Sequence, residues 1–355
     1  MLGLRTSWRD CDMKRARLIC SLIFAVGLVI SGIVFYTVST SVPNLKISML
    51  EPNIENQYYN YLAGGDLCRI EDKLYFNYVE NTMKYGLVEI SSMGSRRVYW
   101  EGVAWSAPGV GLPPLYACNE RIYFYHTTLN DKTKTLEWLN PAESVQGTTN
   151  IQTCSTKNNL YFDQDGAIYY TKSGEYNTYG NLMKLANGEE NLILQNVGCF
   201  LVHDDFIYYT SFEDQAISVR EYNLTSNRNR KLFSSEISII SMMICKQKLI
   251  FMAEMPNYER VLYMYDLNQG SGNQIEPKEI RLSMNSYIVY DDKVYICSDS
   301  GVLVFDLESY DTNVISEQQA STCYIVDHQW LYFCDNEQNL FRVLQTGGTT
   351  AFVYG

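Results

Sequence analysis

The chain alternates short polar turns with apolar, aromatic-rich runs, and one such phrase recurs seven times. Asp and Asn tolerate tight-turn backbone, whereas Tyr, Phe, Ile and Val favour a pleated, half-buried surface, so each copy predicts a turn followed by a β-strand. The segment before each turn is also strand-like, and the phrase therefore predicts a hairpin. The copies recur at roughly 43-residue spacing, the sign of a repeat architecture. They are EDKLYF (71–76), NERIYF (119–124), KNNLYF (157–162), DDFIYY (204–209), KQKLIF (246–251), DDKVYI (291–296) and HQWLYF (328–333).

A second phrase follows each copy after a variable gap, and a third apolar stretch closes most units, as in 97–100 and 231–233. Each unit thus predicts about four antiparallel strands, which is typical of a β-propeller blade. We expect an all-β, seven-bladed propeller with four strands per blade, with six or eight blades as the alternatives. The second phrase reads LVEI (87–90), LEWL (136–139), LMKL (182–185), VREYNL (219–224), LYMYDL (262–267), LVFDL (303–307) and LFRV (340–343).

Two details of the repeat stay open at this level. In the third unit, 167–170 fits the phrase as well as 160–162 does, and choosing Tyr169 as the repeat tyrosine evens out the spacing. At the end of the chain, 349–354 is a candidate outer strand for the last unit. Whether an N-terminal strand within 45–62 also closes the ring stays open.

The N-terminal region predicts a membrane anchor. Residues 18–38 hold no charged side chain and, at about 1.5 Å per residue, match a bilayer core of roughly 30 Å. Basic residues precede this segment and few follow it, so residues 1–17 are expected to be a cytoplasmic tail and the remainder to lie outside. A cleaved signal peptide is the competing interpretation, but its apolar region is normally shorter.

The polar, Pro-containing stretch after the anchor predicts a stalk over residues 39–60, followed by one extracytoplasmic propeller over 61–355. Tyrosines outside the repeat, at 58, 59, 61, 176 and 179, are candidate platforms for carbohydrate or peptide.

The N-terminal segment and the rest of the chain differ in net charge. Residues 1–39 carry five Lys or Arg and two Asp, which leaves a net charge of −15 on the remainder. An acidic domain repels phosphate backbones, so nucleic acid is not an expected partner. The charge indicates a surface that resists association, or else a rim that attracts cations or basic peptides.

Eight cysteines follow the anchor, and six of them precede the repeat tyrosine at recurring offsets. Recurrence in equivalent places predicts free, buried thiols, because cysteines in adjacent blades rarely come within bridging distance. Cys323 and Cys334, which flank one hairpin, are the pair to test for a bridge. The full set is 68, 118, 154, 199, 245, 297, 323 and 334.

No catalytic, metal or cofactor motif emerges. Asp163 and Asp165 begin a calcium-like loop that lacks its later acidic ligand, so they predict a turn. His203 and His328 lie beside equivalent hairpin turns and His126 closes a strand. We therefore name no catalytic residue, metal ligand or cofactor, and leave the binding residues unassigned.

Several strings carry a family resemblance: IYYTKS (168–173), IYYTSF (207–212), VYICSDS (294–300) and LYFCDN (331–336) look like degenerate YWTD-type repeats. Residues 60–355 resemble the low-density-lipoprotein-receptor-related-like β-propeller domains found on bacterial cell surfaces behind one membrane segment. The resemblance implies the propeller fold and surface display, and it transfers no ligand residues.

The function expected from these observations is a membrane-anchored, non-catalytic binding, sensing or scaffolding module for an extracellular protein, peptide or glycan. The alternative is a propeller enzyme acting on surface glycan or peptide. Convergence of unrepeated acidic, His or Arg side chains at the channel mouth would distinguish the two.

Overall fold

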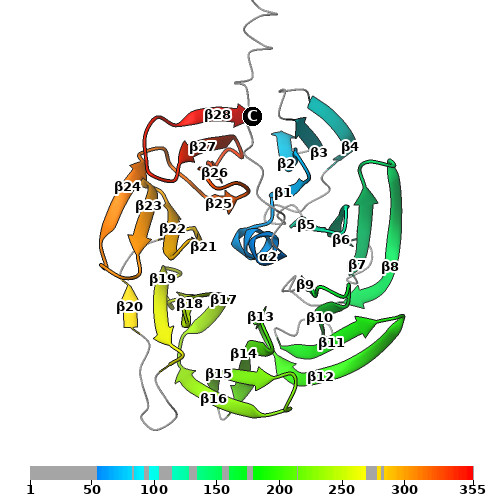
Figure 1. Cartoon of the computed structure of the whole chain (residues 1–355), viewed down its shortest axis with the longest axis vertical. Helices are drawn as coiled ribbons and strands as arrows, with labels where there is room; N and C mark the ends of the chain where they lie inside the picture. The colour runs from blue at the N-terminus through cyan, green and yellow to red at the C-terminus, as the bar shows by residue number, and fades with distance from the viewer. Residues whose placement is uncertain are drawn as a thin grey trace, which may run out of the picture. The chain divides into compact units, whose positions relative to one another are not determined.

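A computed structural model describes residues 54–81, 84–91, 96–103, 114–127, 134–153, 160–173, 179–213, 215–268, 278–280 and 284–354. Over this part the chain forms one helix and seven four-stranded antiparallel sheets arranged as the blades of a propeller (Figure 1). Each blade is built from one continuous segment, in the chain order expected from the repeat. The prediction of seven four-stranded blades is confirmed.

The strands run from the ring centre outwards in each blade (Figure 1). Blades 1 to 4 comprise β1 (Leu67–Ile70), β2 (Lys73–Asn81), β3 (Lys84–Ser91) and β4 (Arg96–Val103); β5 (Tyr116–Cys118), β6 (Arg121–Thr127), β7 (Lys134–Asn140) and β8 (Val145–Thr153); β9 (Leu160–Phe162), β10 (Ile168–Lys172), β11 (Gly180–Ala186) and β12 (Glu189–Val197); and β13 (Phe200–His203), β14 (Phe206–Glu213), β15 (Ala216–Asn223) and β16 (Asn229–Ser235).

Blades 5 to 7 follow the same order. They comprise β17 (Ser238–Cys245), β18 (Lys248–Glu254), β19 (Arg260–Asp266) and β20 (Lys278–Ile280); β21 (Ser286–Tyr290), β22 (Lys293–Ser298), β23 (Gly301–Asp306) and β24 (Thr312–Ser316); and β25 (Thr322–Ile325), β26 (Trp330–Cys334), β27 (Leu340–Leu344) and β28 (Ala351–Tyr354).

In five blades the recurring phrase joins the innermost strand to the second strand by a two-residue turn; the connection is longer in blades 3 and 7. At Asp291 and Asp292 both residues have positive φ, 46° and 66°, and Asn119 and Glu120 repeat the pattern. Two consecutive positive φ values define the turn type that matches the twist of a hairpin, and Asp and Asn adopt them at low cost. In blade 3 the repeat tyrosine is Tyr169 on β10, so the register that evens out the spacing is the correct one.

The helix α2 (Ile54–Ala63) occupies the centre of the ring (Figure 1). It contacts the innermost strands β1, β5, β17, β21 and β25, and Tyr58 extends these contacts to β9 and β13, so the helix contacts all seven blades. Residues up to Asn60 were expected to form a stalk, and this expectation is wrong from Ile54 onwards. The physical reason is that the strands around the channel have backbone N–H and carbonyl groups that need hydrogen-bond partners. The Tyr and Asn side chains of this segment supply them. Residues 39–53 lie outside the described residues.

Within the described residues, no strand is shared between the first and last blades to close the ring. β28 is the outer strand of the last blade, as 349–354 was expected to be, and β1 is the inner strand of the first. Side chains join the two blades instead: the Tyr354 ring lies 5.8 Å from that of Phe76, and Arg69 Nη1 donates to the Val326 carbonyl at 2.6 Å.

The cysteines of the described residues are all free thiols. Cys323 pairs with Phe333 and Cys334 pairs with Thr322 across the same hairpin, so the two thiols point to opposite faces of the sheet and form no bridge. All except the half-buried Cys118 are buried. The expectation of free, mostly interior thiols is confirmed for this part of the chain, and Cys154 lies outside it.

The anchor predicted at residues 18–38 lies outside the described residues. Among the residues that the structure describes, no helix has the length and apolar character needed to cross a bilayer.

Candidate functional site

Helix α2 seals the channel with polar side chains that bond to the strands around it. Tyr58 donates its hydroxyl to the Phe200 carbonyl at 3.0 Å, on blade 4. The Tyr59 hydroxyl donates to the Ile244 carbonyl at 2.9 Å and accepts from the Ile244 N–H at 3.2 Å, on blade 5. Tyr58 and Tyr59, which sequence reasoning marked as a binding platform, are therefore buried structural groups.

Blade 7 is tied to the same helix through Asn60. Its side-chain amide donates to the Ile325 carbonyl at 2.7 Å, and its side-chain oxygen accepts from the Ile325 N–H at 2.8 Å. Tyr61, the third member of the marked cluster, packs on Tyr116 with ring centroids 5.2 Å apart. Burial raises the pKa of Tyr61 well above its ordinary value, so the phenol stays protonated.

The C-terminal end of α2 lies at one mouth of the channel and is capped. Gly65 N–H donates to the Asn60 carbonyl and Gly64 N–H to the Tyr61 carbonyl, the pattern of a glycine-terminated helix. Both glycines have positive φ, and a Cβ on Gly65 would lie 2.4 Å from the Cβ of Pro114. Ser286 Oγ caps a third carbonyl, that of Ala63, at 2.6 Å.

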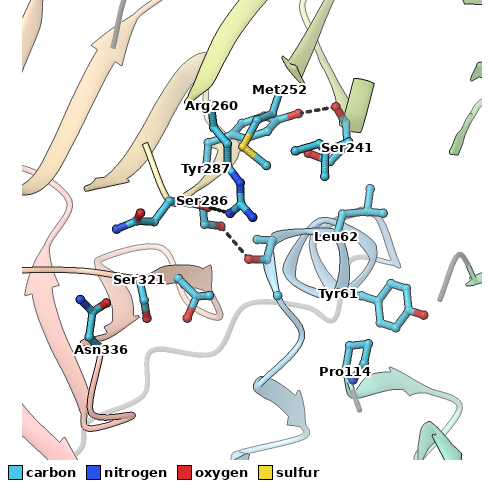
Figure 2. Close-up of a pocket in the computed structure, with 15 residues that line it drawn as sticks. Tyr61, Leu62, Pro114, Ser241, Met252, Arg260, Ser286, Tyr287, Ser321 and Asn336 are labelled. Atoms are coloured by element: carbon cyan, nitrogen blue, oxygen red, sulfur yellow. Dashed lines mark hydrogen bonds between the residues drawn. The ribbon is translucent and has the colours of Figure 1, made fainter. Parts of the chain in front are cut away.

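A cavity of about 520 Å³ opens at this mouth, between the end of α2 and blades 5, 6 and 7 (Figure 2). Its size is within the range typical of small-molecule sites. Its lining includes the apolar residues Leu62, Ile240 and Met252 and neutral polar residues such as Asn285 and Thr322.

Arg260 is the charged residue in the described lining of this cavity. It begins β19, where Nε lies 3.7 Å from Glu254 Oε2 and Nη1 donates to the Asn285 carbonyl at 3.0 Å. Tyr287, deeper in the wall, donates to the Ile250 carbonyl at 3.1 Å, and burial raises its pKa. Sequence reasoning marked Tyr61, which lines this cavity, but not Arg260, because Arg260 lies outside the repeated phrases and carries no motif.

Asp66 follows the helix cap and lies beside the cavity. Its carboxylate accepts a hydrogen bond from the Tyr324 hydroxyl at 2.8 Å. Loss of solvent between the first and last blades raises the pKa of Asp66 to about 6.

The remaining candidates from the sequence are separate from this cavity. Asp163 accepts hydrogen bonds from the backbone N–H groups of Asp165 and Ala167, so its role is to stabilise its own turn. His203 lies 3.6 Å from Asp204, and His328 bonds the Tyr290 hydroxyl at 2.7 Å. No group of three or more metal-ligating side chains occurs in the described part of the chain.

Three candidates from the sequence remain: Tyr176, Tyr179 and His126. Tyr179 is half-buried and its ring packs on that of Phe212, with centroids 6.0 Å apart. Tyr176 and the side chain of His126 lie outside the described residues.

Comparison with known proteins establishes the fold. No protein-family model matches the chain, and no curated protein sequence matches it. Among solved structures, one from a structural and mechanistic analysis of two prolyl endopeptidases aligns with a TM-score of 0.55 at 11% identity, over 86% of this chain and 52% of that one. The β-propeller domain of the Trilobed protease from Pyrococcus furiosus, which has an open velcro topology, aligns with a TM-score of 0.54 at 12% identity, over 82% and 97%.

A third structure, a puromycin-hydrolysing peptidase from Mycobacterium tuberculosis, aligns with a TM-score of 0.53 at 10% identity, over 89% of this chain and 56% of that one. The chain therefore spans about half the length of these two peptidase chains and nearly all of the isolated propeller domain. At this identity the likeness shows the propeller fold alone.

Proposed function

We propose that this chain is a non-catalytic binding module that uses the mouth of its channel, displayed outside the cell behind an N-terminal membrane anchor. The observation that carries the proposal is the cavity at the end of α2. The helix fills the channel below it, and its described lining offers one cation and neutral polar groups, with no carboxylate or imidazole for acid–base chemistry. The resemblance to YWTD-type surface propellers agrees with this role.

The test of binding is an array of peptides and glycans probed with the full chain. Asn336, an exposed residue of the lining, is changed to Trp to block the mouth; Asn313→Trp, on the exposed outer strand β24, is the matched control. We expect Asn336→Trp to abolish the strongest signals and Asn313→Trp to retain them. Turnover of an array substrate by the unmodified chain would instead favour the enzyme interpretation.

The proposed display outside the cell has its own test. Protease added to intact cells is expected to digest the propeller and to leave residues 1–17 protected. Protection of the propeller until the cells are lysed would contradict the proposed orientation.

A further inference from the structure

Arg260 presents a free edge to the mouth cavity. Its Nε faces Glu254 and its Nη1 donates to the Asn285 carbonyl, while Nη2 makes no hydrogen bond with the described residues. In Figure 2 the guanidinium extends from blade 5 towards the end of α2. A guanidinium with a free edge is suited to a carboxylate, which it binds by two parallel hydrogen bonds or by one charge-assisted bond.

The polar residues of the lining add donors that the protein itself does not use. Thr322 is not among them, because its hydroxyl lies 2.8 Å from the Tyr324 hydroxyl, whose single hydrogen is donated to Asp66. Asn336 is exposed at the rim and bonds to none of the described residues. The Asn285 amide is occupied, because it donates to Asp299 and to the Ala320 carbonyl at 3.0 Å each.

The acceptors that would oppose an anion are already paired. Three carbonyls at the end of α2 accept from Gly64, Gly65 and Ser286, which weakens the negative end of the helix dipole. Three carboxylates near the cavity are also engaged: Glu254 faces Arg260 Nε, Asp299 accepts from Asn285, and Asp66 accepts from the Tyr324 hydroxyl. The cavity therefore offers donors, although the domain around it is acidic.

The lining also suits an apolar group. Leu62, Ile240 and Met252 contribute to it, and Met252 lies near Arg260 on the same blade (Figure 2). Thioether and aliphatic surfaces accept varied side chains. A ligand that satisfies both kinds of lining residue carries one carboxylate within a few ångströms of an apolar side chain. The C-terminal residue of a peptide has this chemistry.

We propose that the mouth cavity binds the C-terminal carboxylate of a peptide, with Arg260 holding the carboxylate and with Leu62 and Met252 holding the last side chain. This proposal rests on the proposed function and names its ligand class. A single carboxylate fits better than a phosphate, because the net charge of −15 outside the anchor repels a doubly charged ligand more strongly.

The test is calorimetric titration of the full chain with N-acetyl-Ala-Leu and with its C-terminal amide. We expect the acid to bind at least about tenfold more tightly than the amide, since a charge-assisted bond is worth roughly 1.5 kcal/mol or more. Arg260→Gln is expected to remove the preference, and Arg260→Lys to restore part of it. Arg220→Gln is the control, because Arg220 forms a similar ion pair with Glu213 on blade 4, away from the cavity.

Three outcomes would overturn the inference: no binding of either peptide, equal binding of acid and amide, or an unchanged preference in Arg260→Gln. Circular dichroism of each variant confirms folding, and the Lys variant decides the matter if the Gln variant does not fold. A different result would refute only the carboxylate proposal: Asn336→Trp blocks binding of a glycan or an internal peptide, and the acid shows no advantage over the amide. The proposed binding function would then still hold.

Discussion

At the residue scale, the first and last blades meet around polar groups placed in nearly dry surroundings. Asp66 bonds Tyr324, and Arg69 bonds the Val326 carbonyl. Asp327 is buried and accepts from the N–H groups of Gln329 and Trp330. The hydrogen bonds of these groups fix how the two blades pair. Each buried charge also lowers the stability of the fold, because it loses its hydration.

Asp66 makes this cost measurable as a pH dependence. Its pKa of about 6 in the folded chain lies above the ordinary value of 3.8, so its stabilising effect is complete below about pH 4 and is lost as pH rises through 6. The wild type is therefore expected to lose up to about 3 kcal/mol of unfolding free energy between pH 4 and pH 8 through this group. Asp66→Asn has no such titration, so its stability relative to wild type should rise by the same amount over this range.

The measurement is urea unfolding of both proteins at the two pH values. Asp165→Asn, in an exposed turn, serves as the control and is expected to show no comparable change. A difference between Asp66→Asn and wild type that does not vary with pH would contradict the assignment.

At the element scale, the sequence predicted strands far better than it predicted α2. A strand such as Lys293–Ser298 can be recognised from local sequence, because a polar turn precedes a run of β-branched and aromatic residues. The helix does not, because its partners are backbone groups of distant strands and its buried face is made of Tyr58, Tyr59 and Asn60. The glycine pair after Ala63 was the available signal of a helix end.

Asn60 is the sharpest test of α2, since its two hydrogen bonds serve both backbone groups of Ile325. Asn60→Ala leaves a buried N–H and carbonyl unpaired and is expected to reduce the free energy of unfolding by about 3 kcal/mol. Denaturant unfolding measures it. Leu192→Ala, at an exposed position on β12, is the control, and equal effects of the two changes would refute a structural role for the helix.

At the scale of the whole ring, the repeat phrase gave the number of blades but not the manner of closure. Each blade is self-contained in sequence, so its strands follow from local pattern. The join between blades 1 and 7 depends on residues almost the whole chain apart, such as Asp66 and Tyr324, and no periodicity specifies them. The mouth cavity was missed for the same reason, because α2 and the starts of several blades build it together.

This manner of closure predicts where the ring opens first. Among the strands that the structure describes, none crosses between blades 7 and 1. Packing such as that of Tyr354 on Phe76 and Tyr78, at 5.8 and 5.6 Å, therefore holds them together with α2. Tyr354→Ala removes this packing, and we expect hydrogen exchange to accelerate in β1, β2 and β28 while blade 4 stays protected. Phe233→Ala, in the outer strand of blade 4, is the matched change and should accelerate exchange around its own blade instead. Uniform acceleration by Tyr354→Ala would mean that the ring opens as one cooperative unit and that the seam is no weaker than any other blade contact.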